Sequence, residues 1–184
     1  MADGVHLSLR IIDAIEGRLR PLVGPRVLRV VYQLGYPVLR VWWLAARPRV
    51  TGVKAVVRCG EQVLLVRHTY GKAGRWDVPG GFLRGGEQTD ETMRRELAEE
   101  LGVEPVSARV IARTASRHDH KRETRVTYVA DLADTEVHPS AAEIAEARWF
   151  PRDALPGAAT AFARQMIARA YWDPRLLARP AAAG

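Results

Sequence analysis

Residues 80–103 read GGFLRGGEQTDETMRRELAEELGV, and this stretch decides how the middle of the chain folds. Its second half places Glu96, Glu99 and Glu100 at positions i, i+3 and i+4, so the three carboxylates share one face of an α-helix. Like charges at this spacing cost about 0.2–0.5 kcal/mol per pair. They also come just before Gly102, a helix stop signal, where the helix dipole disfavours negative charge. Because stability alone does not explain this cluster, it indicates a site for a divalent cation.

The remainder of the stretch fits a helix whose N-cap is Thr89 or Asp90 and which ends before Gly102. One apolar residue per turn predicts a narrow stripe that docks on a sheet, namely Met93, Leu97 and Leu101. Arg95 lies four residues after Glu91 and four before Glu99, so it is placed to pair with both. We expect Arg95 to offset the repulsion among the carboxylates, and we expect Glu99 and Glu100 to be exposed.

A glycine-rich loop precedes the helix and can bring backbone close to a ligand; it contains Pro79, Gly80, Gly81, Gly85 and Gly86. Loop and helix together resemble the Nudix box, G-x5-E-x7-R-E-U-x-E-E-x-G-U with U aliphatic. The sequence matches this pattern at every defined position from Gly81 to Val103. The resemblance implies a Nudix (MutT-like) hydrolase, an enzyme that cleaves the diphosphate linkage of a nucleoside diphosphate joined to another group.

The resemblance also implies roles for the residues of the box. The metal ligands would be the carbonyl of Gly81 and the carboxylates of Glu96, Glu99 and Glu100. Arg95 and Glu87 would orient this set, so we expect catalysis to depend on Glu99, Glu100 and Arg95. The expected cofactor is Mg²⁺, with Mn²⁺ as an alternative, because hard oxygen ligands suit both ions. Water then attacks phosphorus, with no covalent protein intermediate.

One further acid is expected in the site. Glu143 and Glu146 precede Arg148, and many members of the family place a Glu near this point as an extra metal ligand or general base. We favour Glu146 as a catalytic residue, while a plain surface loop is the alternative interpretation.

Several residues outside the acidic helix are candidates for substrate binding. Arg67 and His68 end a predicted strand that leads toward the glycine loop, where they can meet phosphate or simply face outward. Trp76 can stack a base or belong to the core. The backbone of Gly80 and Gly81 can approach the substrate closely.

Around the box, the periodicity predicts a sheet and one further helix. The expected strands are 53–58, 63–68, 76–79, 106–113, 124–132 and 144–150, and the expected helix is 158–171. A polar loop, Ser116–Glu123, is expected to cover the substrate with Lys121 and Arg122. The predicted class is α/β (α+β): a Nudix α/β/α sandwich with a mixed sheet, the acidic helix on one face and the C-terminal helix on the other.

Composition describes an ordinary globular chain of 184 residues with a single cysteine, Cys59, which points to a reducing compartment. We therefore expect a cytoplasmic protein. The net charge of +7 is uneven, because residues 1–50 carry eight Arg against three acidic residues. The rest of the chain is nearly neutral, which makes nucleic acid an unexpected partner.

We expect three segments: an N-terminal helical extension at 1–50, a Nudix domain at 51–178 and a loose tail at 179–184. The extension pattern is amphipathic, with Pro37 dividing the helix and no charge-free stretch long enough to span a bilayer. Three interpretations stay open: packing on the domain or on a second subunit in a homodimer, peripheral contact with the inner membrane surface through residues 18–47, and a nucleic-acid arm.

The substrate class is predicted only broadly. The position past the box where ADP-ribose-specific members carry Pro holds Asp119, and the single cysteine leaves no zinc-ribbon set like that of NADH pyrophosphatases. The default expectation is a small nucleotide diphosphate. Two alternatives are an RNA 5′-end pyrophosphohydrolase and a catalytically silent, nucleotide-sensing Nudix module.

Overall fold

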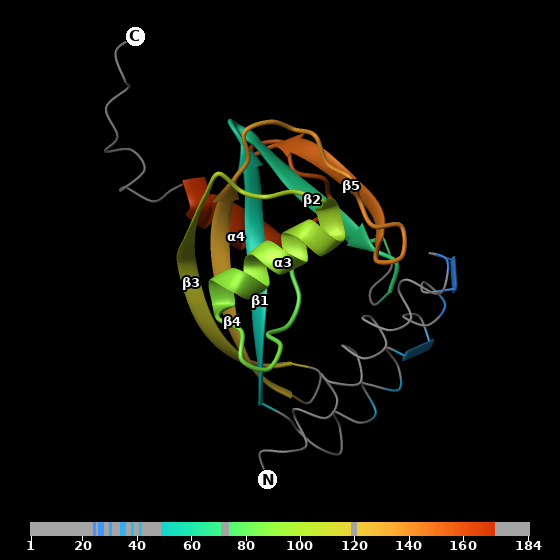
Figure 1. The fold of residues 1–184 in the computed structure, drawn as a ribbon. Coiled ribbons are helices and arrows are strands. Elements are labelled where there is room, and N and C mark those ends of the chain that lie inside the picture. Colours follow the sequence, from blue (N-terminus) through green and yellow to red (C-terminus); the bar gives the residue numbers. More distant parts are fainter. Residues whose placement is uncertain are drawn as a thin grey trace.

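The computed structural model describes residues 49–70, 74–118 and 121–171, together with isolated positions between 24 and 41. The elements are β1 (Arg49–Cys59), β2 (Gln62–His68), α3 (Thr89–Leu101), β3 (Ser107–His118), β4 (Lys121–Asp131), β5 (Ile144–Pro151) and α4 (Ala161–Tyr171) (Figure 1). The strands form one sheet in the order β3-β4-β1-β2-β5. Only β1 and β4 run parallel, and the other neighbours are antiparallel. The predicted mixed sheet is confirmed.

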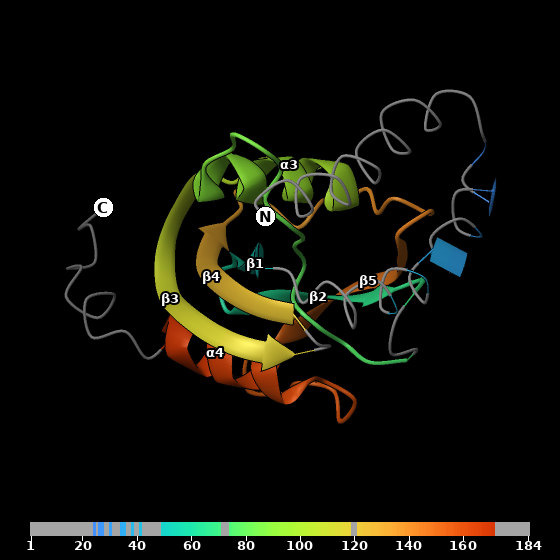
Figure 2. The same cartoon turned by 90° about the horizontal axis from the view of Figure 1, so that it is seen from below.

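Helices cover both faces of this sheet, with α3 on one side and α4 on the other (Figure 2). Alternating residues of β1 and β2 feed two separate cores, because successive side chains of a strand point to opposite faces. The core under α3 contains Met93, Leu97 and Leu101, each at most 1% exposed, which confirms the predicted stripe. The core under α4 contains Met166 and Ile167. The α/β/α sandwich is therefore confirmed.

The N-cap of helix α3 lies one residue before the earlier of the two predicted caps, Thr89 and Asp90. Gln88 occupies the N-cap position with extended backbone, and its N–H donates to the Glu91 carboxylate at 2.7 Å. Glu91 is thus used for capping, and the predicted Glu91–Arg95 ion pair is wrong. Gly102 ends the helix in the left-handed conformation, with φ of 68°, and its N–H donates to the Ala98 carbonyl. The predicted helix stop is confirmed.

Three expectations about strands are corrected. Strands β3 and β4 extend to His118 and from Lys121, so most of the expected loop at 116–123 is paired strand. Residues 119 and 120 lie outside the described residues. The expected strand at 76–79 makes only isolated bridges, from Trp76 to Ala159 and from Asp77 to Val66. Pro79, which has no N–H, and the positive-φ Gly80 prevent a regular ladder there.

The glycine loop instead runs alongside β1. The N–H of Val53 donates to the Gly81 carbonyl at 2.8 Å, and the N–H of Leu83 donates to the Thr51 carbonyl at 2.9 Å. Gly80 has φ of 134°, which side chains rarely permit, and its Cα packs directly on the β1 backbone. These bonds fix the loop between β1 and the start of α3.

Most of the expected N-terminal extension, including most of residues 18–47, lies outside the described residues, as does the expected tail at 179–184. Their proposed contacts with a membrane or a second subunit stay predictions. Among the described residues, no helix is both long enough and apolar enough to cross a bilayer.

Candidate active site

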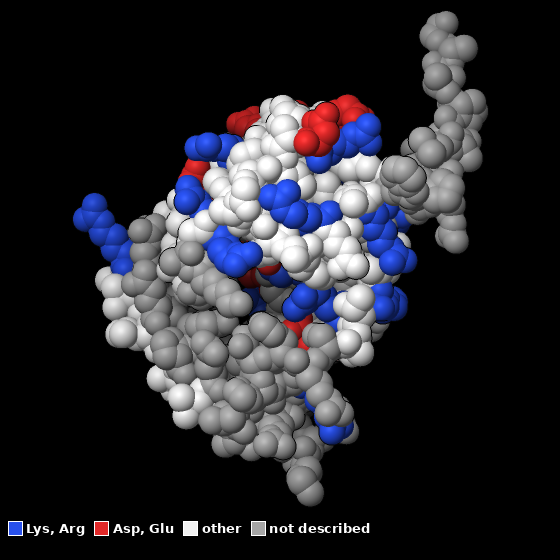
Figure 3. Space-filling view, turned by 180° about the vertical axis from the view of Figure 1, so that it is seen from behind, with Lys and Arg blue, Asp and Glu red and all other residues white. Residues whose placement is uncertain are grey.

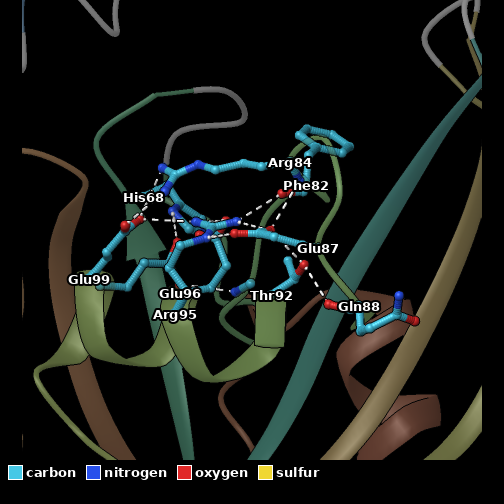
Figure 4. A network of polar contacts seen from close by, with 11 residues as sticks. His68, Phe82, Arg84, Glu87, Gln88, Thr92, Arg95, Glu96 and Glu99 are labelled. Carbon is cyan, nitrogen blue, oxygen red and sulfur yellow. Dashed lines mark hydrogen bonds and ion pairs between the residues drawn. The ribbon is translucent and has the colours of Figure 1, made fainter. Parts of the chain in front are cut away.

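Arg95 lies at the centre of a polar network between α3 and the glycine loop (Figure 4). Its guanidinium donates to both carboxylate oxygens of Glu87, at 2.7 and 3.1 Å. It also donates to Glu96 at 2.9 Å, to Glu99 at 3.1 Å and to the Phe82 carbonyl at 3.1 Å. Arg95 therefore ties the first loop acid to two helix acids, and the predicted contact with Glu99 is present.

This network sets the charge state of its members. Burial alone raises the pKa of Glu87, but hydrogen bonds from Arg95, from the backbone of Arg84 and from Thr92 lower it to about 2. Burial opposes the charge of Arg95, yet Glu87, Glu96 and Glu99 raise its pKa above the ordinary value. Both groups stay ionised at neutral pH, so the network is a fixed charged support for the helix acids.

Glu100 differs from the expectation, because it is only 1% exposed. The N–H of Gly80 donates to its carboxylate at 2.9 Å. Burial first, and then the charge of Glu96, raise the pKa of Glu100 well above its ordinary value. The prediction that Glu100 is exposed is wrong: the glycine loop folds back over this face of the helix. A buried, repelled carboxylate is stabilised as an anion by a nearby cation.

Glu96 and Gly81 lie in contact, which explains why a glycine is needed in the loop. A Cβ built on Gly81 would stand 2.5 Å from the Glu96 carboxyl carbon, closer than real atoms approach. The Gly81 carbonyl accepts the N–H of Val53, and an oxygen with two lone pairs can accept a second interaction. The loop backbone and the Glu96 carboxylate thus form one adjoining set of oxygen atoms.

The donor set fits a hard divalent cation. It consists of oxygen atoms only, and two of its carboxylates, Glu96 and Glu100, lie less than 9% exposed. Within the described ranges, no three carboxylate or imidazole side chains converge closely enough to hold an ion as they stand. The carboxylates contact protein donors instead: Glu96 and Glu99 accept hydrogen bonds from Arg95, and Glu100 accepts one from the Gly80 N–H. Glu96, Glu99 and Glu100 are the residues that would hold the cation.

His68 and Lys54 lie beside the buried acid. The Nδ1 atom of His68 is 3.7 Å from a Glu100 oxygen and is buried without a hydrogen-bond partner. Burial, followed by the charge of Lys54, lowers the pKa of His68 to about 3. His68 is therefore neutral at physiological pH and supplies no positive charge to a phosphate. Sequence reasoning missed Lys54, although a lysine within the apolar run of β1 was a usable signal.

A second group consists of Arg67 on β2, Glu146 on β5 and Trp76 in the segment before the glycine loop. Arg67 pairs with Glu146 across the two strands and lies over the Trp76 ring, 4.6 Å from its centre. Trp76 is 6% exposed and packs edge-on against Phe150 in the core under α4. Because this core lies on the opposite face of the sheet from α3, the structure does not bring Trp76 to the acids. The burial of Trp76 favours the core interpretation over base stacking.

Glu143 lies closer to the acids than Glu146 does. It is 7% exposed, and its charge is one of the influences that raise the pKa of Glu100. The N–H of Thr69 donates to the Glu143 backbone carbonyl, which joins the end of β2 to this segment. Glu146 instead accepts hydrogen bonds from Arg67 and Arg148. Of the two candidates, the geometry favours Glu143 as the additional acid.

Known proteins share this sequence pattern. A NUDIX domain family model matches residues 47–170, about two thirds of the chain. The NAD-capped RNA hydrolase NudC of Erwinia tasmaniensis is 31% identical over 100 residues, covering 54% of this chain and 38% of that protein. NudC of Chromobacterium violaceum is 31% identical over 111 residues, covering 60% and 41%. The chain thus spans about two fifths of the length of these curated relatives.

Solved structures share the fold. A MutT NUDIX hydrolase from Burkholderia pseudomallei aligns with a TM-score of 0.60 at 22% identity, covering 66% of this chain and 97% of that one. The NUDIX domain of Shewanella oneidensis NrtR, complexed with ADP ribose, aligns with a TM-score of 0.58 at 24% identity, covering 72% and 91%. With the box, the sandwich and the family model in agreement, the chain belongs to the Nudix hydrolase family, whose members are pyrophosphohydrolases.

Proposed function

We propose that this protein is a Mg²⁺-dependent pyrophosphohydrolase that acts on a small nucleotide diphosphate. The observation that carries the proposal is the complete acid set: Glu96, Glu99 and Glu100 lie on one helix face. Arg95 donates hydrogen bonds to Glu96 and Glu99. Arg95 is in turn held by the Glu87 carboxylate. A nucleotide-sensing module that had lost catalysis would not need all three acids, so the complete set favours an enzyme.

The reaction adds water across one phosphoanhydride bond. The water oxygen forms a bond to phosphorus, the bond from that phosphorus to the bridging oxygen breaks, and the water proton leaves to an acceptor. A divalent cation bound there supplies acidification of water and neutralisation of charge on the phosphate oxygens. The chain contributes carboxylates that hold the cation, and the loop backbone at Gly80 and Gly81 lies beside them to position the substrate.

A release assay with a panel of nucleotides tests this function. The panel contains nucleoside triphosphates, ADP-ribose and dinucleotides, each with Mg²⁺, with Mn²⁺ and with EDTA. We expect metal-dependent product release from at least one compound, with turnover that rises toward alkaline pH because deprotonated water is the better nucleophile. A turnover that is insensitive to EDTA, or one that peaks at acid pH, would contradict the mechanism.

A second candidate function is hydrolysis of a dinucleotide cap on RNA. It is favoured by the curated relatives, which are named as NAD-capped RNA hydrolases. Figure 3 shows the molecule from the side opposite to α3, where basic side chains are interspersed with uncharged and acidic ones. The same assay separates the candidates when NAD-capped RNA and the unattached dinucleotide are compared: a strong preference for the capped RNA supports the second.

Substitution of each additional acid tests which one assists the reaction. We expect Glu143→Gln to lower kcat about 100-fold, because a buried acid next to Glu100 is placed to act as an extra ligand or base. Glu146→Gln is the matched control, since its carboxylate is engaged by Arg67 and Arg148, and we expect less than a threefold loss. Steady-state kinetics at saturating metal measures both. The reverse order of losses restores Glu146 as the catalytic acid.

A further inference from the structure

Arg84, in the glycine loop, contacts Glu99, one of the three carboxylates that we propose hold the metal. Its guanidinium donates to both oxygens of Glu99, at 3.0 and 3.3 Å, in the fork geometry that suits a carboxylate or a phosphate (Figure 4). Both side chains are one quarter exposed. The loop therefore places a positive charge directly against Glu99.

The two arginines that contact Glu99 are held differently. Arg95 is fastened from behind by both oxygens of Glu87 and by the Phe82 carbonyl. The backbone of Arg84 is anchored separately from its side chain, because its N–H donates to Glu87 at 3.1 Å, while Figure 4 shows the side chain reaching along the acid set to Glu99. The side chain of Arg84 can thus exchange partners while the loop backbone stays in place.

This contact sets up a competition. The oxygens of Glu99 accept from Arg84 and from Arg95, and a cation that binds Glu99 competes with these positively charged donors for the same carboxylate. Displacement of Arg84 from Glu99 releases two of its guanidinium donors next to the acid set, where the proposed function would bring a diphosphate. A guanidinium fork binds phosphate oxygens in the same bidentate way as it binds a carboxylate.

We propose that the Arg84 side chain exchanges partners at this site. It neutralises Glu99 before metal binds, and it moves to the substrate diphosphate when metal binds Glu99. The proposal rests on the proposed function, since it concerns the same site. Arg84 would then link metal binding to substrate binding. Metal binding to Glu99 would release Arg84 for the diphosphate, and diphosphate binding would draw Arg84 away from Glu99 and leave that carboxylate to the metal.

The first test measures metal affinity without substrate. Calorimetry with Mn²⁺ alone on the full chain should show binding about tenfold tighter in Arg84→Gln than in wild type, because a charged hydrogen bond no longer competes for Glu99. Arg94→Gln is the matched control: this arginine lies on α3, the helix that carries Glu99, but it pairs with Glu104 and is 43% exposed. It removes the same charge away from the site, and its Mn²⁺ affinity should equal that of wild type.

The second test measures diphosphate affinity at saturating Mn²⁺. Binding of the non-hydrolysable analogue adenosine 5′-(α,β-methylene)diphosphate should weaken about tenfold in Arg84→Gln, and Arg84→Lys should recover only part of it, because the fork is lost. Unchanged Mn²⁺ affinity or unchanged analogue affinity in Arg84→Gln overturns the proposal. Both readouts are taken without turnover, so a wild-type protein that binds both ligands but hydrolyses nothing contradicts the proposed function and leaves the Arg84 comparison readable.

Discussion

Replacing Glu100 by Gln should lower metal-dependent turnover about 1,000-fold, the scale seen when one preorganised electrostatic group is removed from an active site. Gln keeps the shape of the side chain and can still accept the Gly80 N–H. It lacks the negative charge that would bind the cation. Steady-state kinetics with Mg²⁺ measures the effect, and Glu104→Gln, an exposed acid beyond the helix, should retain wild-type turnover.

The same substitution should not unfold the protein. Burial raises the pKa of Glu100, so the ionised side chain destabilises the folded state, and a neutral Gln removes that cost. In EDTA at neutral pH, the Tm of Glu100→Gln should equal or exceed that of wild type. Added Mg²⁺ should raise the Tm of wild type only. Wild-type turnover in this variant would remove Glu100 from the mechanism.

Gly80→Ala should lower the free energy of unfolding by about 3 kcal/mol, the upper range for a strained backbone position. The backbone at Gly80 has φ of 134°, and an added Cβ would stand 2.9 Å from the Lys54 Cα and nearer still to the Val53 carbonyl oxygen. The loop would have to separate from β1, which also withdraws the N–H from Glu100. Urea denaturation followed by circular dichroism measures the loss.

Gly86→Ala is the matched control for that substitution. Gly86 also has positive φ, at 90°, but an added Cβ would meet nothing within 4 Å. The expected loss is about 1 kcal/mol, from backbone strain alone. Equal unfolding midpoints for the two variants would show that contact between the loop and β1 contributes nothing to stability.

Local features of the fold could be predicted from the sequence. The stripe of Met93, Leu97 and Leu101, and the stop at Gly102, located α3 because helix periodicity and capping depend on neighbouring residues. The paired strands β1 and β2 were predicted at 53–58 and 63–68 from the same kind of short-range pattern. Strand ends were less accessible, since pairing carried β3 and β4 through polar residues that looked like a loop.

The surroundings of the acids could not be predicted, because they depend on contacts between distant segments. Glu100 sits on the helix face that carries its neighbouring acids, yet it is buried because the glycine loop returns along β1. The choice between Glu143 and Glu146 depends on the register of β2 against β5, which pairs Arg67 with Glu146. No spacing within the sequence specifies that register.

The attachment of the glycine loop to β1 couples the acid site to the middle strand of the sheet. The hydrogen bonds from Val53 and Leu83 tie the reacting end to an inner strand of the sheet, where small shifts would propagate into both cores. Strand β5, by contrast, forms one border of the sheet. Changes at that border leave the hydrogen bonds between the loop and β1 in place, so the acids keep their support when the edge of the sheet varies.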